Sequence, residues 1–288
     1  MYLENTLTMA PAESPAVPSA PGAADHPAEA RCFDDRLDGR YVYCIMPDIG
    51  KDEWGAIGLN GERVYTIGWQ DICALVHDCP TEPYQGDDAT VKGWVWTHGE
   101  VIDAAWAETG SVLPMTFDCI VRPVDGHSAP EAVEAWLRTE YDSFRSQLSQ
   151  FAGKVELGVQ VLWRVEEVTR AAAAADPAIA HLGVEMAGKP KGMAYFYQQK
   201  IEKALKAGLE AKADADYRRY FEVVTACAEE AAVNKAKRPA DGKQMLLNLS
   251  LLVRKENVSA LGLVLDSIQA EEGVEVRFTG PWPPYSFV

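Results

Sequence analysis

The sequence predicts an α+β protein built from two sheet-plus-helix units. Three observations support this prediction: β-branched and aromatic runs are interleaved with amphipathic helical segments, neighbouring runs lie close enough for hairpins, and no long βα alternation is present. The chain of 288 residues is long enough for about two domains.

The first unit is predicted from runs that end at turn-forming residues. Gly110 is placed to stop one helix. The segment 48–63 holds four glycines and is expected to be a loop, with room for a short helical turn. The predicted elements are strands at 41–46, 64–68, 72–77 and 112–121, and helices at 90–109 and 129–151.

The second unit opens with the clearest strand, 154–163, in which odd positions are apolar and most even positions are polar. The longest helical candidate is 193–237. Its apolar residues recur mostly every four positions, and a stripe with this spacing drifts around a straight helix. The helix is therefore expected either to break, with Gly208 as the candidate position, or to pack on several neighbouring elements. The other predicted elements are helices at 168–180 and 259–271 and strands at 244–254 and 274–278.

These elements divide the chain into three parts. Residues 1–38 are rich in alanine and proline, lack a secretory-signal pattern, and are expected to form a disordered tail. An N-terminal α+β domain is predicted at 39–152, and a C-terminal α+β domain at 153–288 contains the long helix and a docked aromatic C-terminal tail. Two units of ferredoxin-like type fit the order of strands and helices.

Charge and apolar content exclude several kinds of partner. The formal net charge of −16 repels polyphosphate backbones, so nucleic-acid binding is not expected. No stretch approaches the roughly 18 apolar residues of a membrane helix, so no membrane partner is expected. The six cysteines form no C-x-x-C pair and several lie in apolar runs, which fits buried thiols in a reducing cytoplasm.

The sequence contains no catalytic signature. It lacks a Walker A loop, a dinucleotide-binding glycine motif and a nucleophile elbow, and its five histidines have no metal-ligand spacing, so no catalytic residue, cofactor or metal is predicted. Cys119 with His98 is the single pairing that suggests a nucleophile and a base. A buried thiol and a structural histidine explain the pair better, because a reactive thiol needs an accessible, electropositive setting.

The segment Gly280–Val288 is the most informative part of the sequence. Three prolines fix an extended backbone, and three aromatic side chains carry a large apolar area. Such a segment is expected to dock, either on its own domain or, as the second alternative, on a partner protein as a polyproline-type peptide. Its residues of interest are Pro281, Trp282, Pro283, Pro284, Tyr285 and Phe287.

This terminal string resembles the Gly-Pro-Trp-Pro-Pro-Tyr-x-Phe signature of the gas vesicle protein F/L family (GvpF/GvpL). Three further segments follow in the family's order. Residues 41–45 resemble its opening Tyr-x-Tyr strand, Leu113, Pro114, Met115 and Phe117 fall in a Val-Leu-Pro-Met-Arg-Phe-Gly-like segment, and Glu156 falls in a Gly-Lys-x-Glu-x-x-Val-like strand. Thr116 replaces the usual arginine and Asp118 the usual glycine, so any contact of that arginine is lost or reshaped.

The resemblance covers residues 40–288 and implies a non-enzymatic accessory protein of gas vesicles, located at the vesicle in the cytoplasm. It implies association with the small, apolar shell protein (GvpA) and with other gas vesicle accessory proteins, as an assembly factor, a minor structural component, or both. Exposed aromatic residues near Trp282 or along 193–237 are the expected contacts with shell-protein subunits.

Two other functions remain open. A ferredoxin-like small-ligand-binding or sensory module would need a closed pocket with convergent polar groups, which a thermal-shift screen with metabolites would detect. An enzyme using Cys119 or an acidic pair would lose its activity in a Cys119→Ala variant.

Overall fold

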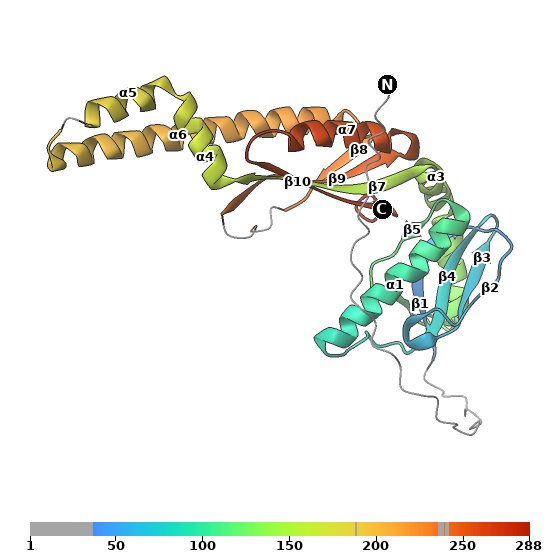
Figure 1. Cartoon of the computed structure of the whole chain (residues 1–288). Helices are drawn as coiled ribbons and strands as arrows, with labels where there is room; N and C mark the ends of the chain where they lie inside the picture. The colour runs from blue at the N-terminus through green and yellow to red at the C-terminus, as the bar shows by residue number, and fades with distance from the viewer. Residues whose placement is uncertain (1–36, 188, 236–238, 240–241) are drawn as a thin grey trace, which may run out of the picture. The chain divides into compact units, whose positions relative to one another are not determined.

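The computed structural model describes residues 37–187, 189–235, 239 and 242–288 (Figure 1). All but the last two residues of the predicted disordered tail at 1–38 lie outside this range. Two separate antiparallel sheets form, the first from strands between residues 39 and 121 and the second from strands between 154 and 282.

The first sheet is built around a fully buried central strand. Its strands are β1 (Gly39–Pro47), β2 (Glu53–Gly55), β3 (Val64–Trp69), β4 (Ile72–Cys79), β5 (Leu113–Pro114) and β6 (Ile120–Val121), in the order β2-β3-β4-β1-β5 with β6 also paired to β1. Tyr41 to Met46 are all 0% exposed, because side chains of β1 enter cores on both faces of the sheet, with a register shift between Val42 and Cys44. This explains why the run is continuously apolar rather than alternating.

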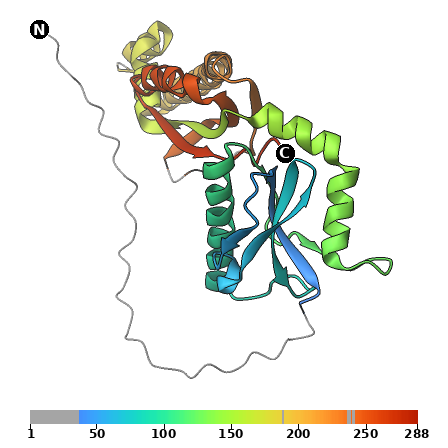
Figure 2. The same ribbon diagram turned by 90° about the vertical axis from the view of Figure 1, so that its right-hand side faces the viewer.

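Helices cover both faces of this sheet. α1 (Asp88–Thr109) packs on one face, and α2 (Ala129–Thr139) and α3 (Tyr141–Phe151) pack on the other (Figure 2). The carboxylate of Asp87 caps the start of α1. Gly110, the predicted stop, ends the helix with a φ of 75°.

The second sheet is covered by helices on one face. Its strands are β7 (Lys154–Arg164), β8 (Glu230–Val233), β9 (Lys243–Arg254) and β10 (Val274–Trp282), in the order β10-β7-β9-β8. α4 (Val165–Ala175), α5 (Pro177–Met186) and α6 (Lys191–Thr225) connect β7 to β8, and α7 (Val258–Gln269) connects β9 to β10. The odd positions of β7 pack against α6 and α7, which confirms the predicted period-2 strand.

The predicted α+β class, with two sheets and a long C-terminal helix, is confirmed. The ferredoxin-like description stays a prediction: the second unit has the order β-α-β-β-α-β, whereas the first places four strands before its first helix. The domain boundary between residues 152 and 153 also stays a prediction, because the described part of the chain forms one compact unit.

Five predicted elements differ from the structure. The segment 48–63, predicted as a loop, contains the short strand β2, which forms because it pairs with β3. The strand at 112–121 is two short strands, β5 and β6, and the helix at 129–151 is interrupted at Glu140. The helix at 168–180 is interrupted at Asp176, whose carboxylate accepts a hydrogen bond from Ala178 N (2.8 Å) and restarts the helix with Pro177 in its first turn. α6 continues through Gly208, since one exposed helical glycine costs only about 1 kcal/mol, and it ends at Thr225.

The core of the second sheet offers a direct test of this packing. Leu249 is 0% exposed, so Leu249→Ala is expected to lower the free energy of unfolding by about 2–5 kcal/mol, as measured by urea denaturation. Leu263→Ala is the control, because Leu263 is 73% exposed on α7 and its loss is expected to cost less than about 0.5 kcal/mol. Equal effects of the two substitutions would contradict the assigned core.

Candidate functional site

The C-terminal segment 280–288 is held in place by a buried carboxylate. Glu156, on β7, is only 7% exposed, and Trp282 lies opposite it in the β10–β7 ladder. The two carboxylate oxygens of Glu156 accept hydrogen bonds from Ser286 N (2.7 Å) and Ser286 Oγ (2.5 Å). Ser286 Oγ also lies 3.0 Å from Ser250 Oγ on β9. The segment is therefore tied to two adjacent strands of the second sheet.

The segment divides its side chains between the protein interior and the surface. Pro283 and Pro284 are buried, and Phe287 packs against a core cluster that contains Leu113 and Leu252, one residue from each sheet. Trp282 and Tyr285 remain 47% and 43% exposed. The prolines and Phe287 thus anchor the segment, while the two larger aromatic rings face outward.

Trp282 and Tyr285 form one wall of a groove of about 510 Å³ whose other wall is the outer face of α1. We call this the α1 groove. Its lining residues are Val91, Lys92, Val95, Trp96, Gly99, Glu100, Asp103, Trp282 and Tyr285. Trp96 is 72% exposed and Val95 is 47% exposed, so large apolar side chains line the groove without being covered by the chain's own described residues.

Two carboxylates lie among these apolar side chains. Partial desolvation raises the pKa of Asp103, and the nearby charge of Glu100 raises it further. Gly99 lies in the middle of α1, where a glycine costs about 1 kcal/mol relative to alanine. An added Cβ at Gly99 would meet no atom within 4 Å, so packing within this chain does not require glycine there. The missing side chain keeps the groove open.

The segment 113–117 runs beside β1 and contacts a buried histidine. Met115 N donates to the carbonyl oxygen of Tyr43 (2.9 Å), and Met115 O lies 3.1 Å from Nε2 of His98. A carbonyl oxygen can only accept, so Nε2 carries the proton, and His98 Nδ1 accepts from the Tyr41 hydroxyl (2.9 Å). Burial lowers the pKa of His98, which agrees with a neutral imidazole.

Asp118 shows why glycine is usual at this point of the motif. Its φ is 71°, in the left-handed region that favours glycine. Aspartate tolerates this conformation, and here its carboxylate accepts a hydrogen bond from Tyr84 N (3.0 Å), while its own amide donates to the Tyr41 hydroxyl (3.1 Å). Thr116, at the usual arginine position, is exposed.

The structure does not bring Cys119 and His98 together as a nucleophile and a base. Both ring nitrogens of His98 are engaged by Tyr41 and Met115. Burial, reinforced by the charge of Asp118, raises the pKa of the Cys119 thiol, so the thiolate form is disfavoured at neutral pH. Within the described residues, no group of three His, Cys, Asp or Glu side chains is placed to hold a metal ion.

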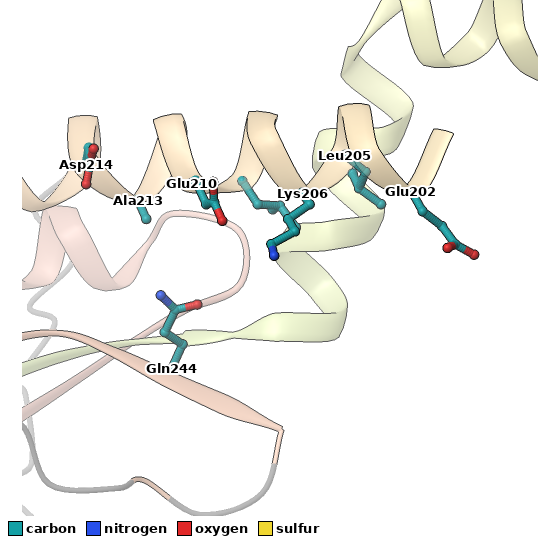
Figure 3. Close-up of a pocket in the computed structure, with 8 residues that line it drawn as sticks. Glu202, Leu205, Lys206, Glu210, Ala213, Asp214 and Gln244 are labelled. Atoms are coloured by element: carbon teal, nitrogen blue, oxygen red, sulfur yellow. The ribbon is translucent and has the colours of Figure 1, made fainter. Parts of the chain in front are cut away.

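Two further cavities lie along the second sheet. One, of about 510 Å³, is lined by α6 and Gln244 of β9, with Lys206 and Glu210 pointing from the helix toward the side of Gln244 (Figure 3). The other, of about 630 Å³, is lined by both polar and apolar residues, among them Glu156, Asn248 and Leu249. Several of its polar groups bond one another, as in Gln160 Nε2 to Asn248 Oδ1 (3.3 Å) and Asn234 Nδ2 to Ser250 Oγ (3.0 Å).

No helix in the described ranges is long and apolar enough to cross a membrane.

Comparison with known proteins identifies the family. A family model described as "Gas vesicle synthesis protein GvpL/GvpF" matches residues 39–288. The chain belongs to the GvpL/GvpF family. This confirms the resemblance carried by the C-terminal signature and the three upstream segments.

Curated GvpL/GvpF relatives match along most of their length. Gas vesicle protein L2 of Halobacterium salinarum is 31% identical over 273 residues, which cover 91% of this chain and 95% of the relative. Gas vesicle protein L1 of the same organism is 29% identical, with 87% of this chain and 90% of the relative covered. The crystal structure of GvpF from Anabaena has a TM-score of 0.66 at 20% identity, with 87% and 98% coverage, which shows a shared fold.

The structure joins the predicted site residues into two groups. In the first group, Glu156 contacts the C-terminal segment directly. In the second group, Pro114 and Met115 lie along β1. Phe117, also in the second group, lies against the rings of Tyr41 and His98. Phe287 and Leu113 share one core cluster. Ser286, Trp96 and Gly99 were not predicted from the sequence as site residues.

The Glu156 contact predicts a local and a global effect. Glu156→Ala removes both acceptors of Ser286, and it is expected to lower the free energy of unfolding by about 2 kcal/mol and to make the C-terminal residues susceptible to carboxypeptidase. Glu134→Ala, at an exposed position on α2, is the control. If Glu156→Ala is as stable and as resistant as the control, the carboxylate does not hold the segment.

The buried histidines predict a pH dependence of stability. Burial lowers the pKa of His77 from 6.5 to about 4. Between these two pH values the unfolded chain therefore binds more protons than the folded chain. The contribution of neutral His77 to the free energy of unfolding is complete above pH 6.5 and is lost as pH falls toward about 4. His77 alone accounts for about 2 kcal/mol between about pH 7.5 and about pH 5.

Urea unfolding at the two pH values measures this loss. His77→Gln is expected to reduce it, whereas His127→Gln, at an exposed position, should leave it unchanged. An identical loss in the His77→Gln variant would show that His77 is not the titrating group.

Proposed function

We propose that this protein is a non-enzymatic accessory protein of gas vesicles that acts in vesicle assembly, as an assembly factor, a minor structural component, or both. The observation that supports the proposal most directly is the match of the GvpL/GvpF family model to residues 39–288. The proposed location is the gas vesicle in the cytoplasm, and the proposed partners are the shell protein GvpA and other accessory proteins.

The arrangement of side chains supports a binding role rather than catalysis. Cys44, Cys73 and Cys79 are buried, and burial raises the pKa of each thiol. His77 and His98 are buried and held neutral. These three thiols and two imidazoles are therefore used in packing, while several large aromatic side chains, Trp96 and Phe196 among them, are exposed.

Among the described residues, exposed aromatic side chains cluster at two places, whereas Tyr217 and Phe278 are exposed singly, and both clusters are candidate contacts with an apolar partner. One is the α1 groove with Trp96, Trp282 and Tyr285. The other is the beginning of α6, where Tyr195 and Phe196 are 61% and 66% exposed. Exposed clusters of this kind on an acidic protein mark interaction sites.

The proposal is tested by deleting the gene from its own or a transplanted gas vesicle cluster and measuring pressure-collapsible light scattering. We expect the signal to be lost and to return when the intact gene is supplied in trans. Normal vesicles in the deletion strain would contradict a required role in assembly.

Complementation with variants then tests the exposed aromatic residues. The double substitution Trp282→Ser, Tyr285→Ser is expected to reduce the scattering signal severalfold while the purified protein keeps its fold, because both side chains are about half exposed. Leu263→Ser is the matched exposed control on α7. Full complementation by the double variant would show that these two side chains are not a contact.

A further inference from the structure

The α5–α6 hairpin carries an exposed apolar surface away from the core of the second sheet. We call residues 177–206 the arm. Phe196 lies 24 residues before Tyr220 on the continuous helix α6, which corresponds to about 36 Å at 1.5 Å per residue. Tyr220 is 0% exposed in the core, whereas Met193, Tyr195 and Phe196 are 50%, 61% and 66% exposed. The helices of the arm extend beyond the second sheet (Figure 1), so these exposed aromatic residues lie away from its core.

The charge of this region is opposite to that of the whole protein. Between residues 189 and 206 the sequence has five lysines and one glutamate, in a chain whose net charge is −16. α1, which forms the α1 groove, has four carboxylates and one lysine. A basic aromatic surface and an acidic aromatic surface are thus present on the same molecule.

The two surfaces also match in spacing. On α6, Phe196, Lys200 and Lys203 occupy positions i, i+4 and i+7, and all three are exposed. On α1, Trp96, Glu100 and Asp103 occupy positions i, i+4 and i+7, and they too are exposed. Residues with this spacing lie on one face of a helix. Each face therefore starts with an aromatic ring and continues with two charges, positive on α6 and negative on α1.

We propose that the arm of one copy of this chain docks in the α1 groove of a second copy, with the Phe196 face of α6 parallel to the Trp96 face of α1. In this register Phe196 meets the aromatic residues of the groove, Lys200 faces Glu100, and Lys203 faces Asp103. Gly99 lets the incoming helix approach α1 closely, as small residues do at helix contacts.

The arm is supplied by another copy rather than by its own chain. α6 is continuous from Lys191 to Thr225, so the arm cannot fold back without breaking the helix. Among the described elements, α5 packs on α4 and α6, and no substantial contact joins it to α1. The raised pKa of Asp103 agrees with a carboxylate that gains from a nearby cation.

Different surfaces of the two copies meet in this contact, so it is heterologous and can continue from copy to copy unless it closes into a ring. A docked copy also covers the exposed aromatic residues until another partner displaces it. The inference concerns self-association and does not depend on the proposed role in gas vesicles.

Sedimentation velocity over a dilution series of the full-length protein tests the contact. We expect reversible, concentration-dependent association that weakens with added salt. Lys203→Glu alone and Asp103→Lys alone are each expected to weaken it about fivefold or more, because each puts like charges face to face. An equimolar mixture of the two variants restores opposite charges between copies and should regain association.

Matched substitutions separate docking from folding. Gly99→Gln fills the groove and is expected to weaken association about tenfold, whereas Gly93→Gln, on the same helix, should not; an added Cβ meets no atom within 4 Å at either position. Phe196→Gln should weaken association about tenfold, and Leu263→Gln should not. Thermal unfolding of each variant is expected to match that of the unmodified chain.

Two results would overturn the inference. One is a monomer at every concentration. The other is association that Gly99→Gln and Lys203→Glu leave unchanged, or that the mixture of charge variants fails to restore. If Gly99→Gln reduces vesicle formation but not self-association, the groove binds a different protein such as the shell protein, and the proposed function stands while this inference fails. If association is lost when residues 1–36 are deleted, that segment and not the arm occupies the α1 groove, and the inference fails.

Discussion

The contact on which the described site depends is the pair of hydrogen bonds from Ser286 to the buried carboxylate of Glu156. A buried carboxylate is costly unless charge-assisted bonds satisfy it, and here the satisfying groups come from a residue 130 positions away in the sequence. This fixes the segment that carries Trp282 and Tyr285. The same segment places Phe287 against core residues of both sheets. This polar contact, together with the packing of Phe287 and the pairing of Trp282 with β7, thus fixes where the exposed aromatic residues face.

The first sheet depends on a different kind of constraint. Every side chain from Tyr41 to Met46 is buried, so the polar tips of its tyrosines need partners inside the protein. Tyr41 is satisfied by His98 and Asp118 N, and Tyr43 by Leu59 N (2.9 Å). These bonds hold α1 and the loop around Leu59 against the sheet. The orientation of α1, and with it the α1 groove, follows from the burial of two tyrosines.

Much of the fold could be predicted because it rests on local patterns. The alternation in 154–163 and the glycine after α1 each correspond to a structure that forms for local reasons. β8 could not be predicted: Glu230–Val233 has the composition Glu-Ala-Ala-Val and becomes a strand because β9 supplies a partner. The breaks at Glu140 and Asp176 lie inside apolar stripes that continue on both sides, so periodicity alone predicts one helix in each case.

The site was predictable only in part. Composition marked residues 280–288, and the family resemblance marked Glu156, but neither indicated that these two regions touch. The α1 groove could not be predicted from periodicity, because it forms only when α1 lies beside a segment that is about 180 residues later in the chain.

Native-state hydrogen exchange of the Ser286 amide tests this account most directly. The account predicts that this amide, although close to the C-terminus, is protected as strongly as neighbouring amides of β7 in the intact protein, and that Glu156→Ala removes the protection. An amide that exchanges in the unmodified protein as fast as an unstructured peptide would contradict it, because the segment and its aromatic residues would then not be fixed at the α1 groove.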